Sequence, residues 1–316
     1  MIFLWVPCLL LAFFALSGAA LLLYCCGRRR LPEFWDASVL LRMGAGSRRG
    51  AVQEGKAWLE AHSAETVETR ADDDVPLRGL FLPQKVTGRG TVLLLHDVRS
   101  SWKLDCPEAA GFFFSRGYQV LLADGRAHGA SGGRWTTYGI WERFDVRSWT
   151  EYLAQRFGET HRIWIYGVGM GGAAALMAAP LDLSGDVRGI MAESVYNSPW
   201  RFVNLRLGQH LQPLPAAPLT ALLNLSCFLT RGFGLRDSSA EQGIRESEYP
   251  LLLLFAEKGE LLAPEDIRNL AAANPGGLTT LFRAEGAQRG ACWQMDRERL
   301  TAAVLAFLEK SLLEYI

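Results

Sequence analysis

The segment most typical of chemistry in this 316-residue chain runs from Tyr166 to Gly172 and reads Tyr-Gly-Val-Gly-Met-Gly-Gly. It follows an apolar stretch and begins an alanine-rich one, which predicts a sharp turn between a buried strand and a helix. In the pattern G-x-S-x-G such a turn presents a serine nucleophile at the edge of a sheet. The position of that serine is Gly169, which has no side chain, so no acyl intermediate can form there.

The bulk composition excludes several classes of function. Lys and Arg together number 33, as do Asp and Glu, so no net charge attracts nucleic acid, and no nucleic-acid partner is expected. The sequence contains no metal-ligand spacing and no repeat, and neither a metal nor a cofactor is expected. The six cysteines form no recognisable disulfide framework.

The first 27 residues are expected to form a transmembrane anchor. Ile2 to Cys26 carries no charged side chain and, as a helix, is long enough to cross a hydrocarbon core of ~30 Å. A secretory signal peptide would begin with basic residues, which are absent here, and would have a shorter apolar run. Arg28, Arg29 and Arg30 follow the span directly, so the positive-inside rule predicts a single-pass protein whose main domain lies in the cytoplasm.

After a membrane-proximal connector over residues 28–64, the pattern predicts one α/β domain over residues 65–316. Apolar runs of the buried-strand kind alternate with helical stretches, which indicates a mostly parallel sheet covered by helices on both faces, with antiparallel strands at its N-terminal end. A long insertion at about residues 196–248 is expected to form a lid over the carboxyl edge of the sheet. The expected strands are 66–70, 77–83, 91–96, 119–123, 162–166, 189–192, 251–255 and 279–282, and the expected helices are 53–61, 108–116, 141–157, 171–179, 265–273 and 297–313.

Three further segments resemble the α/β-hydrolase superfamily, in particular a bacterial membrane-anchored branch of serine-aminopeptidase-like and lysophospholipase-like proteins. Leu95–His96–Asp97 is similar to the His-Gly that ends the third strand. The stretch 124–133 resembles the loop Asp-x-Arg-x-His-Gly-x-Ser-x-Gly, and 138–146 resembles the helix start Gly-x-x-Glu-x-x-Asp-Val. In that branch the turn at 166–171 usually reads Tyr-Gly-Val-Ser-Met-Gly. The resemblance covers most of residues 65–316 and implies the α/β-hydrolase fold.

The resemblance also implies where a catalytic triad would lie, and this chain departs from it. The nucleophile position is Gly169, and the acid position falls on either Gly259 or Glu260. The base position, in Glu285–Gly290, is Arg289, which cannot accept a proton at neutral pH. The triad is therefore expected to be degenerate, with Arg289 paired to Glu260 or Glu257.

The backbone does not depend on the missing serine. The N–H groups of Met170 and of Asp97 or Val98 are expected to form a site like an oxyanion hole, which would hold an anion or a carbonyl without turnover.

Other residues that could do chemistry are more simply explained as structural. Cys292 has no general base expected near it, and His96 and His128 are expected to hold loops through hydrogen bonds. The expected function is therefore that of a membrane-anchored pseudohydrolase, which binds a small acyl, lipid or peptide ligand in the residual cleft, or a protein partner. The alternative is an active esterase or peptidase that uses non-standard residues. A cleft filled by large side chains would favour a structural scaffold, and an open apolar pocket under the lid would favour ligand binding.

Overall fold

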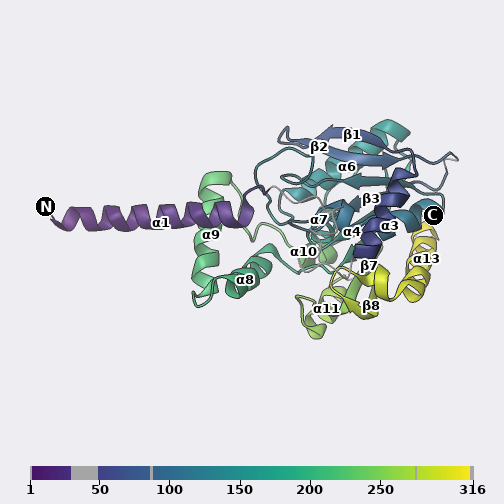
Figure 1. Ribbon diagram of the computed structural model, residues 1–316. Helices are drawn as coiled ribbons and strands as arrows, with labels where there is room; N and C mark the ends of the chain where they lie inside the picture. Colours follow the sequence, from purple (N-terminus) through teal and green to yellow (C-terminus); the bar gives the residue numbers. More distant parts are fainter. Residues whose placement is uncertain (1, 30–48, 86–87, 275, 314–316) are drawn as a thin grey trace.

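The computed structural model describes the chain except for residues 1, 30–48, 86–87, 275 and 314–316. Its centre is one eight-stranded sheet with the strand order β1-β2-β4-β3-β5-β6-β7-β8 (Figure 1). The first pairs, β1 with β2 and β2 with β4, are antiparallel, and all later pairs are parallel. The predicted α/β-hydrolase fold, with antiparallel strands at its N-terminal end, is confirmed.

The strands follow the hydrophobic pattern of the sequence. The central ones are buried along their whole length, as expected for strands covered on both faces. The edge strand β1 is mostly exposed and carries polar residues. The bounds are β1 Glu65–Arg70, β2 Pro76–Leu82, β3 Thr91–Leu95, β4 Gln119–Ala123, β5 Arg162–Val168, β6 Asp186–Glu193, β7 Leu251–Lys258 and β8 Thr279–Gln288.

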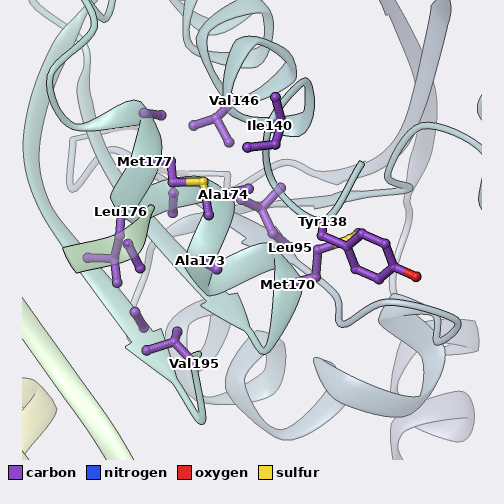
Figure 2. Packing of buried hydrophobic residues seen from close by; sticks show 14 of the residues in the cluster. Leu95, Tyr138, Ile140, Val146, Met170, Ala173, Ala174, Leu176, Met177 and Val195 are labelled. Atoms are coloured by element: carbon purple, nitrogen blue, oxygen red, sulfur yellow. The ribbon is translucent and has the colours of Figure 1, made fainter. Parts of the chain in front are cut away.

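The helices cover the two faces of the sheet. Helix α7, Met170–Ala178, is buried throughout because its alanines and glycines allow it to lie close against the sheet, as Figure 2 shows for Ala173 and Ala174. The other helices of the domain are α3 Arg49–Glu60, α4 Trp102–Asp105, α5 Pro107–Ser115, α6 Glu142–Phe157, α11 Pro264–Ala271, α12 Cys292–Met295 and α13 Arg297–Leu313.

The N-terminal helix α1, Ile2–Cys26, projects from the domain (Figure 1). Its stretch Trp5–Cys26 is long and apolar enough to cross a membrane, by length and composition. Only its domain-side end is packed, since Leu21, Leu22, Cys25 and Cys26 are buried while Trp5 to Leu16 is largely exposed. The connector predicted over residues 28–64 falls partly outside the described residues, which resume at Arg49 with α3.

The insertion at 196–248 contains three helices, α8 Pro199–His210, α9 Ala216–Arg231 and α10 Ala240–Glu246. Helix α10 packs on α7, whereas α9 packs against both α8 and α1. In Figure 1, α9 lies across the domain-side end of α1. Of the three helices of the predicted lid, α9 therefore packs beside the N-terminal helix.

Candidate functional site

The turn between β5 and α7 retains the backbone of a nucleophile elbow. Gly169 has φ +54° and ψ −111°, a conformation that a side chain other than hydrogen adopts only with strain. Its N–H donates to the carbonyl of Glu193 at 2.8 Å, which ties the turn to the end of the neighbouring strand β6. The backbone is thus held in the elbow geometry although the residue has no side chain.

The carboxylate of Asp97 fills the space above this turn. A Cβ atom built on Gly169 would lie 2.0 Å from Cγ of Asp97, and 2.1 and 2.3 Å from its two carboxylate oxygens. These distances are far shorter than any non-bonded contact between carbon and oxygen. No residue with a side chain fits at position 169 while Asp97 stays in place.

One oxygen of this carboxylate accepts two backbone hydrogen bonds. Oδ1 of Asp97 accepts from the backbone N–H of Met170 at 2.7 Å and from that of Val98, also at 2.7 Å. The two donors converge on one point, as they would on a developing oxyanion. The N–H of Asp97, grouped with these donors in the sequence analysis, points elsewhere and donates to Asp105 Oδ2 at 2.9 Å.

The second oxygen of Asp97 pairs with Arg289. Nη1 of Arg289 lies 2.9 Å from Asp97 Oδ2, and Nη2 donates to the carbonyl of Ser194 at 3.2 Å. Burial alone would lower the pKa of Arg289, but the charge and hydrogen bond of Asp97 raise it above its ordinary value. Arg289 is therefore a fixed cation in this site.

The expected pair of Arg289 with Glu260 or Glu257 is corrected by this contact. Glu257 pairs instead with Arg283 near the surface, at 3.4 Å. The sequence could not find the Asp97 pair because the fold joins two loops that are 192 residues apart.

At the acid position the side chain that reaches the site belongs to Glu260. Its Oε1 accepts from the Ser194 hydroxyl at 2.7 Å and from the N–H of Ala256 at 2.8 Å. Its Oε2 is buried without a hydrogen-bond partner among the described residues. Burial raises the pKa of Glu260 above its ordinary value. Gly259, the other candidate, has φ +75° and forms the turn before it.

The two histidines near the site are both engaged with backbone groups. His96 Nδ1 lies 2.8 Å from the Asp97 carbonyl, and its Nε2 accepts from the N–H of Gly125 at 3.0 Å. His128 makes the same kind of contacts with the Arg126 carbonyl and the N–H of Arg99. Burial, assisted by the charge of His96, lowers the pKa of His128 to about 3. Neither ring has a free nitrogen with which to act as a base.

Cys292 is also enclosed. It is fully buried, and burial raises the pKa of its thiol well above the ordinary value. A reactive cysteine needs the opposite shift. Across the residues that the structure describes, no three His, Cys, Asp or Glu side chains gather in a way that could hold a metal ion.

Aromatic side chains of the insertion pack together near the site. Tyr196 and Phe202 stack with ring centroids 4.5 Å apart, and the Tyr196 hydroxyl donates to the carbonyl of Tyr138 at 2.9 Å. Burial raises the pKa of Tyr196 well above its ordinary value, and the negative charge of Asp97 is the second cause of this shift. The side chains of Asp97 and Arg289 themselves remain exposed by 14% and 23%.

Beside this site lies a cavity of about 240 Å³. It joins three parts of the molecule, namely the end of α1, the loop after β3 and one side of α8. Its lining residues are Tyr24, Cys25, Val98, Arg99, Tyr138, Phe202, Val203, Arg206, Leu207 and His210.

The same loop that forms the oxyanion-hole-like site holds the end of α1. Arg99 donates to the carbonyls of Tyr24 at 2.5 Å and of Cys25 at 3.2 Å, and the Tyr138 hydroxyl donates to the Cys25 carbonyl at 2.6 Å. These donors satisfy carbonyls that the last turn of a helix leaves unpaired. This connection has no signal in the sequence, because it links a helix end to loops far along the chain.

The chain belongs to the alpha/beta hydrolase family, whose model matches residues 92–303. The uncharacterized protein YqkD of Bacillus subtilis (strain 168) is 25% identical over 222 residues, which is 69% of this chain and 71% of YqkD.

Solved structures share the fold. The Pyrococcus furiosus esterase Pf2001 is similar with a TM-score of 0.63 and 22% identity, covering 79% of this chain and 92% of that one. An alpha-beta hydrolase from Vibrio vulnificus is similar with a TM-score of 0.61 and 20% identity, covering 89% and 88%.

Proposed function

We propose that this protein is a catalytically inactive member of its family that is anchored in a membrane by α1 and acts by binding. The observation that carries the proposal is the position of the Asp97 carboxylate. It occupies the space that the side chain of a nucleophile at position 169 would need. Its Oδ1 also accepts from the two N–H groups that would bind the oxyanion of a reacting ester. A substrate carbonyl cannot enter the same place.

The charges support this reading. Removing one partner of a largely buried Asp–Arg pair destabilises the folded protein, because it leaves the other charge uncompensated. Arg289 stands at the position where relatives carry the histidine base, and its fixed positive charge stabilises the carboxylate that blocks the oxyanion hole. The two substitutions, aspartate for glycine at 97 and arginine for histidine at 289, therefore support each other.

The ligand of the proposed binding protein is a small acyl compound, a lipid or a peptide, or else a protein partner. The cavity beside α8 favours a ligand over a purely structural scaffold, because it is open and lined by both apolar side chains and the cations Arg99 and Arg206. The proposed anchor is single-pass, with the main domain in the cytoplasm, as Arg28 and Arg29 at its domain-side end favour.

The proposal is tested by ester hydrolysis with the full chain in detergent micelles. We expect no turnover of p-nitrophenyl acetate, butyrate or octanoate above the rate of a sample in which the protein has been unfolded. Circular dichroism of the native sample shows that it is folded. Turnover well above that background, lost on Ser194→Ala or Cys292→Ala, would show an active hydrolase with non-standard residues and overturn the proposal.

A further inference from the structure

We propose that helix α9 lies in the membrane beside α1 and presents its open face to lipid acyl chains. The inference rests on the proposed anchoring by α1 and extends it from one helix to the insertion 196–248. The two helices pack against each other. A Cβ atom on Gly18 of α1 would lie 2.1 Å from Oγ of Ser226, so the helices are in close contact there.

The position of Gly18 along α1 sets the depth of this contact. Trp5–Cys26 spans about 33 Å at 1.5 Å per residue, close to the ~30 Å of a hydrocarbon core. Gly18 lies about 12 Å from the Cys26 end of this span. If Trp5–Cys26 crosses the bilayer, the part of α9 that touches Gly18 lies below the surface of the same bilayer.

The composition of α9 suits that environment. From Leu211 to Thr230 the chain has no charged side chain. One face of α9 packs on α8 and α1 and includes Thr220, Leu223 and Cys227, which are fully buried. The opposite face is open and still apolar, with Leu225, Phe228 and Leu229 exposed by 51%, 63% and 71%. A helix that is apolar on all sides but half exposed is not expected in water.

The charges around the open face fit the surface of a membrane. Between Tyr196 and Asp237 the chain has four arginines, Arg201, Arg206, Arg231 and Arg236, and no acidic residue or lysine. All four are exposed, although the whole chain has no net charge. Arg231 stacks on Trp135 at 4.2 Å, and Arg99 and Arg29 lie over Tyr24, so aromatic rings and cations form a belt at the end of α1. Such belts mark the interface of anionic membranes.

Membrane insertion of α9 would give lipids a route from the bilayer into the cavity beside α8. The cavity beside α8 is lined by Tyr24 and Cys25 at the interface end of α1. With α9 in the lipid, this cavity opens at the level of the headgroups, and an acyl chain with an anionic head can enter it laterally. Arg206 then lies at the height of that head.

The test is the depth of a spin label in the full chain, reconstituted in vesicles with one quarter phosphatidylglycerol. Native Cys8 is exposed on α1 and the other cysteines are buried, so labelled wild type gives a reference for the anchor. Phe228→Cys and Met295→Cys are made in a Cys8→Ala background. Met295 is a matched control, because it is apolar and 60% exposed but lies on α12, away from α1.

The measured quantity is the ratio of the label's collision rate with oxygen to its collision rate with a water-soluble nickel chelate. We expect this ratio at position 228 to be several-fold higher than at position 295 and close to that at Cys8. If the ratio at 228 equals that at 295 while the label at Cys8 lies in lipid, the inference about α9 is wrong but the proposed anchoring by α1 is supported. A label at 228 shielded from both reagents would mean that a protein covers α9, and would also overturn it. Cys8 in water would refute the proposed anchor itself.

Discussion

Neighbouring residues of the loop after β3 face very different surroundings. Asp97 is held between two backbone N–H groups and Arg289. The next two residues, Val98 and Arg99, line an open cavity next to α1 and α8. Within two residues the loop therefore passes from a carboxylate held by hydrogen bonds and an ion pair to an open cavity where the N-terminal helix meets the insertion.

The largest expected effect concerns the neutral His128 on the side of Asp97. Its pKa is lowered to about 3, so between pH 6.5 and 3 the unfolded chain binds a proton that the folded chain does not. Stability should therefore fall as the pH falls through this window, by up to about 5 kcal/mol from this residue. Urea unfolding in micelles at pH 7 and pH 4 should show a smaller loss for His128→Gln than for wild type. Equal losses would mean that His128 titrates near its ordinary pKa and is free to act as a base.

A slightly smaller effect is expected from breaking the ion pair. Arg289→Met leaves the carboxylate of Asp97 without its partner and should lower the free energy of unfolding by about 4 kcal/mol. Arg283→Met is the matched control, because Arg283 pairs with Glu257 near the surface and its loss should cost under about 1 kcal/mol. In the double variant Asp97→Asn, Arg289→Met most of the loss should disappear. Additive losses would show that the two side chains do not depend on each other.

The crowding at the elbow gives a third test. Gly169→Ala places a methyl group 2.0 Å from Asp97 Cγ and should cost about 3 kcal/mol. Gly277→Ala is the control for backbone strain alone, since Gly277 has φ +66° and no atom near its Cβ position, and it should cost about 1 kcal/mol. In an Asp97→Gly background the cost of Gly169→Ala should fall to that of the control. If Gly169→Ala lowers the free energy of unfolding equally in both backgrounds, the Asp97 side chain does not lie above the elbow.

The smallest effect is expected on the open side. Leu229→Ala removes a side chain that is 71% exposed on α9 and should change stability in micelles by less than about 0.5 kcal/mol. Leu223→Ala, on the buried face of the same helix, should cost about 2–5 kcal/mol. Equal losses would mean that the open face packs against protein.

Much of the fold follows from the sequence because it depends on local patterns. Runs such as 91–95 and 251–256 are apolar, bounded by turns and separated by helical stretches, and these features suffice for a parallel sheet. The helices of the insertion were harder to predict, because α9 is apolar on all sides and lacks the periodicity that marks a helix on a core.

The sequence alone singles out a site position where the residue type decides the chemistry. Gly169 and Arg289 are such positions, because neither residue type can serve in the role expected there. The side chain of Asp97 also stands out, because the resemblance implies a glycine at that position. Its contact with Arg289 depends on tertiary structure and could not be found from spacing.

The most direct test of the central claim is labelling by a fluorophosphonate, which reacts only with an activated nucleophile. The full chain in micelles would be compared with the triple variant Asp97→Gly, Gly169→Ser, Arg289→His, which clears the oxyanion hole, restores a hydroxyl and places an imidazole near Glu260. We expect no labelling of wild type and labelling of the triple variant at position 169. Stoichiometric labelling of wild type at any serine would contradict it.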